Sequence, residues 1–404
     1  MSRDGGADDS KAAARVGRCA GAAASAMRVA LVAGETSGDL LGAGLVREIA
    51  ARARSATFEG IAGPRMCREG ATTLYAMESI SIMGLDGLVN NLRHILSIRN
   101  ALFERFADTK PDVFVGIDVP DFNLGLEYRL RRAGIPTVHY VSPTVWAWRR
   151  YRLRKIRRAV NHMLTLFPFE ARFYEERGIP VTFVGHPLAD RIELLDRSEA
   201  RRRLGIATAG PIVALLPGSR SSEISRLGGL FVETALLLGD VVPGLRFVLP
   251  CAGAHIRDGL HHLVAEAGME DRITLIDGNA QVALQAADVA LLASGTAALE
   301  AALVATPMVV AYRVSPLSYH VVKWFTTVSH YSMPNHLLDT PVVPEFIQKD
   351  ATAPRLAAAV REFLDDAARR ESMRSRLSGI RESLAVGADR RAAQVVLDVA
   401  GRVH

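Results

Sequence analysis

Residues 28–40 read RVALVAGETSGDL, an apolar run that ends in a turn with two glycines and continues as a helical pattern. Continuous apolar runs are typical of strands buried on both faces of a parallel sheet. Similar runs follow in the first half of the chain, separated by helix-length segments such as 38–53 and 121–133. They are VFVGI (113–117), TVHYV (137–141), MLTLF (163–167) and VTFV (181–184). This alternation predicts βαβ units and a parallel sheet.

The second half of the chain repeats the scheme after a polar, charge-rich segment at 190–203. Its apolar runs are IVALLP (212–217), RFVLP (246–250), ITLI (273–276), VALLA (289–293) and MVVAY (308–312). We therefore expect an α/β fold with two Rossmann-like, doubly wound domains facing a cleft, which is the glycosyltransferase B architecture. The expected parts are a disordered extension at 1–26, one domain at 27–190, and a second domain with a helical tail at 191–404.

Composition excludes several classes of protein. The 404 residues contain no apolar run near the roughly 18–20 residues that a membrane-spanning helix needs. The three cysteines are far apart and form no CxxC pair, which argues against a disulfide framework or a metal site and favours the cytoplasm. Seven positive charges lie in RRYRLRKIRR (149–158), while the whole chain carries a net charge of +6. Such a local basic patch is not typical of a nucleic-acid binder.

Two acidic residues follow strands of the first half. Loops at the carboxyl ends of parallel strands bind ligands in open α/β sheets. Glu35 lies in the turn after the first run, and Asp118 comes directly after the run at 113–117. Asp118 suits a general base that takes a proton from a hydroxyl, whereas Asp121 is better placed to cap the next helix. The alternative for the first turn is purely structural, with Ser37 or Asp39 as a helix N-cap.

Two glycine-containing turns in the second half suit a nucleotide. Gly218 permits close backbone approach, and Arg220 can donate two parallel hydrogen bonds to a diphosphate. The second turn opens a helix, whose N-terminus favours a phosphate, and Glu300 lies about one turn further, where it could receive ribose hydroxyls. The residues of this turn are Ser294, Gly295 and Thr296.

Two further segments point to an interfacial or phosphorylated substrate. Trp146 and Trp148 precede the basic run, whose candidate lipid-binding residues are Arg152, Arg154, Arg157 and Arg158. The alternative is a solvated basic helix with its tryptophans in the core. Residues 80–106 have an amphipathic pattern, with Leu88 and Leu92 on the apolar face and Arg93 on the polar face. This stretch is either a helix facing the core or an apolar surface for acyl chains near phospholipid headgroups.

Together these segments resemble the lipid-A-disaccharide synthase family. The motifs that carry the resemblance occur in the family's order between residues 33 and 335, and cover most of the chain. They are AGETSGDLLGAGL, AGPRMCREG, PDVFVGIDVPDFN, HYVSPTVWAW, LLPGSR, LLASGTAALE and SMPN. The resemblance implies inverting transfer from UDP-2,3-diacylglucosamine to 2,3-diacylglucosamine 1-phosphate, giving a β-1′,6-linked disaccharide 1-phosphate and UDP. It implies no cofactor or metal, and a place at the cytoplasmic face of the inner membrane. A homodimer is compatible with the sequence.

The resemblance also implies residue roles. It gives Asp118 the place of the catalytic base and Glu35 an essential place in the first loop. Arg220 matches an arginine near the donor diphosphate, and Asn335 matches a functionally important asparagine. The first domain would hold the acceptor and the second the donor. The chain departs from the family pattern in its N-terminal extension and in MGLDGLVNN (83–91). The alternatives are a UDP-sugar epimerase or hydrolase on the same fold, and a nucleotide-sugar-binding regulatory protein without catalysis.

Overall fold

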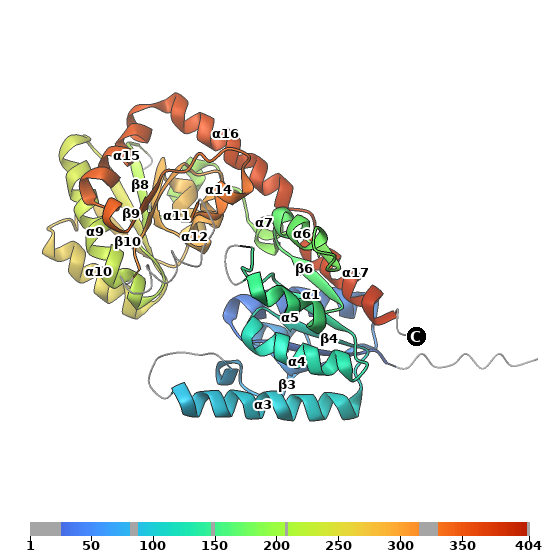
Figure 1. Cartoon of the computed structure of the whole chain (residues 1–404). Coiled ribbons are helices and arrows are strands. Elements are labelled where there is room, and N and C mark those ends of the chain that lie inside the picture. The colour runs from blue at the N-terminus through green and yellow to red at the C-terminus, as the bar shows by residue number, and fades with distance from the viewer. Residues whose placement is uncertain (1–25, 81–87, 147–149, 207–208, 315–329, 402–404) are drawn as a thin grey trace, which may run out of the picture.

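The fold contains two parallel sheets, each covered by helices (Figure 1). The computed structural model describes residues 26–80, 88–146, 150–206, 209–314 and 330–401. The first sheet has the order β3-β2-β1-β4-β5-β6-β7 and the second has the order β10-β9-β8-β11-β12-β13. Both follow the doubly wound arrangement in which strand order reverses beside the first strand of the domain. The expected α/β fold class is confirmed.

All ten predicted runs form strands, and three further strands were missed. The first sheet consists of β1 (Arg28–Ala33), β2 (Thr57–Ile61), β3 (Ala71–Thr73), β4 (Val113–Ile117), β5 (Thr137–Tyr140), β6 (His162–Thr165) and β7 (Val181–Phe183). The second consists of β8 (Ile212–Leu216), β9 (Arg246–Cys251), β10 (Ile273–Asp277), β11 (Val289–Ala293), β12 (Met308–Tyr312) and β13 (Glu345–Ile347). The missed β2, β3 and β13 are short and carry polar residues, so they lack an apolar run.

Helices cover both faces of each sheet. In the first domain they are α1 (Thr36–Arg52), α2 (Pro64–Arg68), α3 (Leu88–Thr109), α4 (Pro120–Arg132), α5 (Leu153–Ala159), α6 (Pro168–Glu175) and α7 (Pro187–Arg191). The second domain and tail contain α8 (Arg197–Arg203), α9 (Ser221–Val241), α10 (Ala254–Glu266), α11 (Ala280–Ala286), α12 (Thr296–Leu303), α14 (Met333–Leu337), α15 (Ala353–Asp365), α16 (Ala367–Leu384) and α17 (Ala388–Gly401). Within the described ranges, no helix is both long and apolar enough to cross a bilayer.

Strand β1 shows how the sequence fills both faces of the first sheet. Its side chains alternate, so Val29 and Leu31 join the apolar cluster under α1 and α17, whereas Ala30 and Val32 join the cluster under α3 and α4. Burial on both faces explains why this strand reads as an uninterrupted apolar run.

The C-terminal tail returns to the first domain. Helix α15 packs on the second sheet, α16 runs from the second domain toward the first, and α17 packs against α1 (Figure 1). The Asp190 carboxylate accepts hydrogen bonds from the backbone N–H groups of Gly387 and Ala388 at 2.9 and 2.7 Å, which caps α17. The limits 27–190 and 191–404 remain our proposal for the two domains, except that the packing of α17 on α1 assigns residues 388–401 to the first domain. Residues 1–25 of the expected extension lie outside the described residues.

Candidate active site between two parallel sheets

Loops at the carboxyl edges of the two sheets contact each other. Trp146, in the loop after β5, packs edge-on against His336 of α14, with ring centroids 5.0 Å apart. Phe169, in the segment after β6, lies 4.9 Å from Trp146 and 6.2 Å from His336. Since α14 follows β12 in the chain, these contacts join the ligand-binding edge of one sheet to that of the other.

The first-domain pocket has a volume of about 300 Å³ and contains both predicted catalytic residues. Glu35 comes from the loop after β1, and Asp118 from the loop after β4. The two loops approach closely because Gly34 has no side chain: a Cβ there would lie 2.6 Å from Cγ2 of Val119. The pocket is lined by Glu35, Ile80, Leu92, Ile95, Leu96, Arg99, Asp118, Val119, Pro120, Asp121 and Phe122. It therefore places three carboxylates, those of Glu35, Asp118 and Asp121, beside an apolar wall from α3.

The backbone at Asp118 has an unusual conformation. Asp118 and Val119 have φ angles of 54° and 42°, in the left-handed region. Such a conformation costs a non-glycine residue about 1–3 kcal/mol and is concentrated at functional sites. The Asp118 N–H donates to the carbonyl of Tyr140 at 2.8 Å, which fastens this turn to β5. Surrounding contacts thus hold the carboxylate at the sheet edge.

Asp39 of the same motif has a different role from the one expected. Its buried carboxylate accepts hydrogen bonds from the backbone N–H groups of Arg65 and Met66, both at 3.0 Å. The structural alternative for the first turn, in which Ser37 or Asp39 caps the helix that follows, is wrong, because Glu35 occupies the N-cap position of α1 without a side-chain bond. Asp39 instead caps α2, across the sheet edge.

The second-domain pocket has a volume of about 270 Å³ and collects most of the predicted donor residues. These are Gly218, Arg220, Ser294, Gly295, Thr296 and Glu300. The φ angles of Gly218 and Gly295 are 136° and 153°, so both turns favour glycine. Burial raises the pKa of Glu300, and a hydrogen bond from Gln281 partly opposes this effect. A half-buried carboxyl group with a raised pKa is suited to hydrogen bonding with hydroxyl groups.

Sequence reasoning missed Glu223 in this pocket. Its carboxylate accepts hydrogen bonds from the N–H groups of Ser219 and Arg220 at 2.9 and 3.3 Å, and its other oxygen lies 3.3 Å from the Arg220 guanidinium. Glu223 is the third residue of α9, where acidic side chains often accept bonds from the preceding turn. That spacing could have indicated its role in shaping the turn.

Asn335 does not line either pocket. Its Oδ1 accepts from the N–H groups of Val342 and Val343, both at 3.0 Å. Its Nδ2 donates to the Val343 carbonyl at 2.9 Å and to Glu345 at 2.7 Å. Every polar position of this amide is therefore engaged within the second domain. Glu345 also accepts a hydrogen bond from the Tyr331 N–H at 2.8 Å, and the Tyr331 carbonyl accepts from the hydroxyl of Ser294 in the donor pocket at 2.8 Å.

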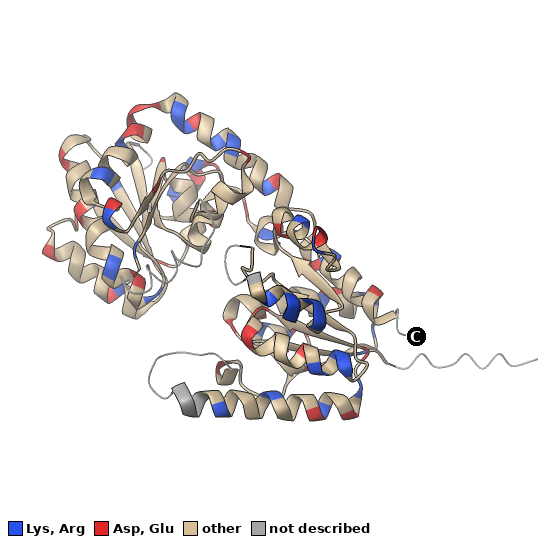
Figure 2. Cartoon of the chain, in the orientation of Figure 1, with Lys and Arg blue, Asp and Glu red and all other residues tan. Residues whose placement is uncertain are grey.

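The basic run continues into α5, where Figure 2 shows lysine and arginine positions close together. The side chains of the run have different surroundings. Arg152 pairs with Asp121 at 2.6 Å, and Arg157 donates to the Arg177 carbonyl. Arg154 and Arg158 are exposed on α5. Of the four arginines predicted to bind lipid, Arg154 and Arg158 are therefore available to a charged surface, whereas Arg152 and Arg157 form bonds within the domain.

The aromatic and amphipathic candidates also differ in position. Trp146 is half-buried between the domains, where its indole N–H donates to Glu170 at 3.2 Å. Leu92 is 53% exposed and lines the first-domain pocket, while Arg93 is exposed nearby. Helix α3 otherwise buries Ile95 in the core, so it both packs on the domain and presents an apolar edge. Trp148 and the side chain of Leu88 lie outside the described residues.

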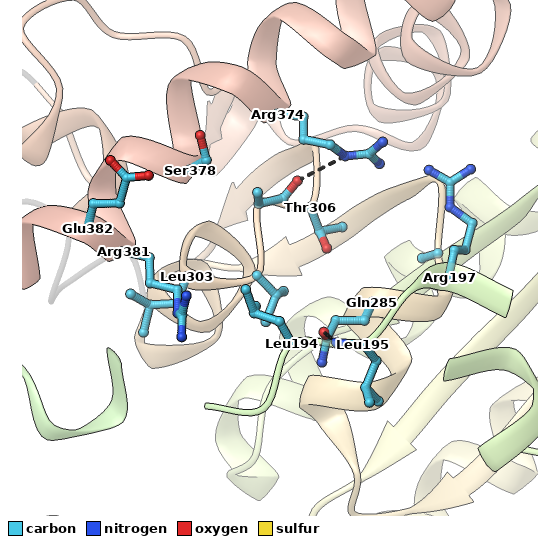
Figure 3. A pocket seen from close by; sticks show the side chains of 13 residues that line it. Leu194, Leu195, Arg197, Gln285, Leu303, Thr306, Arg374, Ser378, Arg381 and Glu382 are labelled. Atoms are coloured by element: carbon cyan, nitrogen blue, oxygen red, sulfur yellow. Dashed lines mark hydrogen bonds between the residues drawn. The ribbon is translucent and has the colours of Figure 1, made fainter. Parts of the chain in front are cut away.

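A further cavity of about 390 Å³ contains none of the predicted site residues. It lies between the segment joining the domains, α11 and α16, and includes Leu194, Gln285 and Arg374 (Figure 3). Among the residues that the structure describes, no three His, Cys, Asp or Glu side chains cluster as metal ligands.

The chain is similar to proteins of one named family over nearly its whole length. The model of the family described as "Lipid-A-disaccharide synthetase" matches residues 29–399. A lipid-A-disaccharide synthase of Pseudomonas fluorescens is 49% identical over 379 residues, which covers 94% of this chain and 99% of the relative. One of Pseudomonas aeruginosa is 49% identical over 381 residues, covering 94% and 100%.

Solved structures with low sequence identity share the fold. The glycotransferase of kitacinnamycin has a TM-score of 0.60 at 18% identity, covering 92% of this chain and 98% of that one. A UDP-GlcNAc 2-epimerase from Neisseria meningitidis, bound to UDP-GlcNAc, has a TM-score of 0.56 at 14% identity, covering 93% and 100%. These similarities show that this chain has the two-domain architecture found in glycosyltransferases and epimerases.

Proposed function

We infer the function from the premise that the chain belongs to the lipid-A-disaccharide synthetase family. It is a glycosyltransferase that transfers a glucosaminyl unit from UDP-2,3-diacylglucosamine to 2,3-diacylglucosamine 1-phosphate, with inversion, giving a β-1′,6-linked disaccharide 1-phosphate and UDP. The observation that carries the assignment is 49% identity over 94% of the chain to relatives of that name. The alternative of an epimerase or hydrolase rests on fold alone, at 14% identity.

We assign Asp118 as the general base. Its carboxylate would take the proton from the 6-hydroxyl of the acceptor while the oxygen attacks the anomeric carbon of the donor. The bond from that carbon to the UDP oxygen breaks, and its electron pair leaves with UDP. The supporting observation is that Asp118 and Glu35 share a pocket with the apolar wall of α3, which suits an acylated sugar. We assign Glu35 to orienting the acceptor hydroxyl.

We assign the second-domain pocket to the donor. Arg220 would bind the diphosphate through its guanidinium, and Gly295 and Thr296 would present N–H groups at the start of α12. Glu300 would accept hydrogen bonds from ribose. Asn335 would act through the segment it holds rather than by contact. This arrangement stabilises negative charge on the departing UDP, where it develops in the transition state.

We further propose that the protein works at the cytoplasmic face of the inner membrane as a peripheral protein. Its substrates carry acyl chains, each buried CH₂ of which contributes about 0.8 kcal/mol to partitioning into lipid. Exposed Leu92, Arg93, Arg154 and Arg158 lie in the domain that would receive the acceptor. That the protein forms a homodimer is a separate proposal, which light scattering tests.

Product analysis tests the function. Purified protein is incubated with both acylated substrates, and the products are identified by mass spectrometry. We expect the disaccharide 1-phosphate and UDP. Asp118→Asn should lower kcat by about 100-fold or more, since a positioned base contributes about 10²–10⁴-fold, while UDP affinity stays unchanged. Release of free sugar without a disaccharide would support a hydrolase instead, and near-normal turnover of the variant would remove Asp118 from the role.

A further inference from the structure

We propose that Arg99 on α3 binds the phosphate of the acceptor, so that it selects 1-phosphorylated over unphosphorylated acylglucosamine. This inference rests on the proposed function, since it assumes that the first-domain pocket receives the acceptor. It assigns a specificity-determining residue that the motif comparison did not indicate.

Arg99 is placed as a phosphate ligand should be. It lines the same pocket as Asp118 and Glu35, and its side chain is half-buried. Its guanidinium lies over the backbone of α4, since a Cβ on Gly125 would come within 2.5 Å of Nη1. Its Nε is buried without a hydrogen-bond partner among the described residues. A buried donor without a partner is costly, so a shift of this side chain toward a ligand acceptor in the pocket would be favoured.

The charge around Arg99 is not neutralised by its neighbours. Burial lowers the pKa of Arg99, and the positive charge of Arg129 lowers it further. Burial lowers the pKa of Lys155 on α5; the charge of Asp121 opposes this effect, and the charge of Arg99 adds to it. The nearby acid Asp121 is already paired with Arg152 at 2.6 Å. Four cations, Arg99, Arg129, Arg152 and Lys155, therefore lie near this side of the pocket, against the exposed carboxylate of Asp121 and the buried one of Glu127.

The chemistry of the acceptor matches this arrangement. The 6-hydroxyl that attacks the donor is attached through C6 to C5, and the phosphate is attached to C1, so the two groups flank the ring oxygen of one sugar. Asp118 would lie at the hydroxyl and Arg99 at the phosphate, and a pocket of about 300 Å³ suits one ring. A guanidinium binds phosphate through two parallel hydrogen bonds, which a lysine ammonium does not reproduce. Leu92 and Ile95, within two turns of Arg99 on the same helix, would meet the acyl chains.

The test compares two acceptors in detergent micelles: 2,3-diacylglucosamine 1-phosphate and the same lipid without phosphate. Wild type, Arg99→Ala, Arg99→Lys and the control Arg105→Ala are measured with each. Arg105 lies on the same helix, is exposed, and pairs with Glu59 at 2.7 Å outside the pocket. We expect Arg99→Ala to lower kcat/KM for the phosphorylated acceptor by about 10- to 100-fold, with an unchanged KM for the donor. Activity toward the unphosphorylated acceptor should change little, and Arg99→Lys should be intermediate.

Inhibition by soluble glucosamine 1-phosphate is a second measurement. It tests whether Arg99 binds the phosphate even if the wild type does not use the unphosphorylated lipid. The inhibition constant should rise about tenfold or more in Arg99→Ala and stay unchanged in Arg105→Ala. Equal losses with both acceptors, or an unchanged inhibition constant, would overturn the inference. If wild type and Arg105→Ala make no disaccharide from either acceptor, the proposed function itself fails.

Discussion

The side-chain amide of Asn123 donates a hydrogen bond to the backbone carbonyl of Asp118 at 2.8 Å. The same amide lies 3.3 Å from the carbonyl of Val32 and 3.4 Å from that of Ile117. Asn123 is fully buried on α4, so it connects the ends of β1 and β4 to the helix that follows Asp118. One amide thus supports the left-handed turn that presents the proposed base.

We predict that Asn123→Ala lowers kcat by about 10- to 100-fold, because small displacements of a catalytic group are costly. It should also lower the free energy of unfolding by about 1–3 kcal/mol, since buried carbonyls lose their donor. Steady-state kinetics and thermal unfolding measure the two effects. Asn100→Ala is the control, since Asn100 is exposed and its amide oxygen accepts from Arg129. Equal effects of the two substitutions would contradict the role of Asn123.

For the donor pocket, we predict that Arg220→Ala and Glu300→Gln each weaken UDP binding by about tenfold or more. A hydrogen bond to a charged group contributes about 1.5–3 kcal/mol. Isothermal titration calorimetry with UDP is the measurement. Arg226→Ala is the matched control, because Arg226 is exposed on α9 outside the pocket and donates to the Ser222 carbonyl at 2.7 Å. Unchanged UDP affinity in both test variants would place the nucleotide elsewhere.

Glu170 should make the stability of the protein depend on pH. Burial raises its pKa to about 8, although hydrogen bonds from Phe167 and Trp146 oppose the rise. Between about pH 4.5 and 8, the folded state keeps this proton and the unfolded state releases it. The contribution of Glu170 to stability is therefore fully present below pH 4.5 and is lost as pH rises toward 8.

Denaturant unfolding of wild type and Glu170→Gln at several pH values between 5 and 8 checks this prediction. The free energy of unfolding of wild type relative to the variant should fall with rising pH, by at most about 1.4 kcal/mol per pH unit. Glu175→Gln, an exposed position on the same helix, should leave the pH dependence as in wild type. Parallel curves for wild type and Glu170→Gln would show that Glu170 ionises normally.

The basic surface of α5 should bind anionic lipid. We predict that Arg154→Gln with Arg158→Gln weakens binding to anionic vesicles about tenfold or more, since each charge near such a surface contributes about 1 kcal/mol. Sedimentation with anionic and neutral vesicles at two salt concentrations is the measurement. The control replaces Arg54 and Arg68, two exposed arginines elsewhere in the first domain, with Gln. Binding that is insensitive to salt and to both substitutions would leave α5 without this role.

The sequence by itself determined the two sheets, the main ligand loops and the family. Strands such as β4 and β11 are buried on both faces, so burial alone requires the uninterrupted apolar runs that were recognised with correct bounds. Gly218 and Gly295 have φ angles that favour glycine, and this constraint is local to each turn. A structural requirement that is local to one segment can therefore be recognised from the residues of that segment.

Only the tertiary structure decided the roles that depend on residues far apart in the chain. Asp39 caps α2, which begins 25 residues later, and α17 packs on α1 across most of the chain. The sequence pattern around Arg99 predicts a helix that faces either the core or the surface. The packing of α3 on α4 brings Arg99 to the pocket that contains Asp118. Such contacts follow from the order of strands and the packing of layers. No single segment contains that information, because the partner is defined only when the chain has folded.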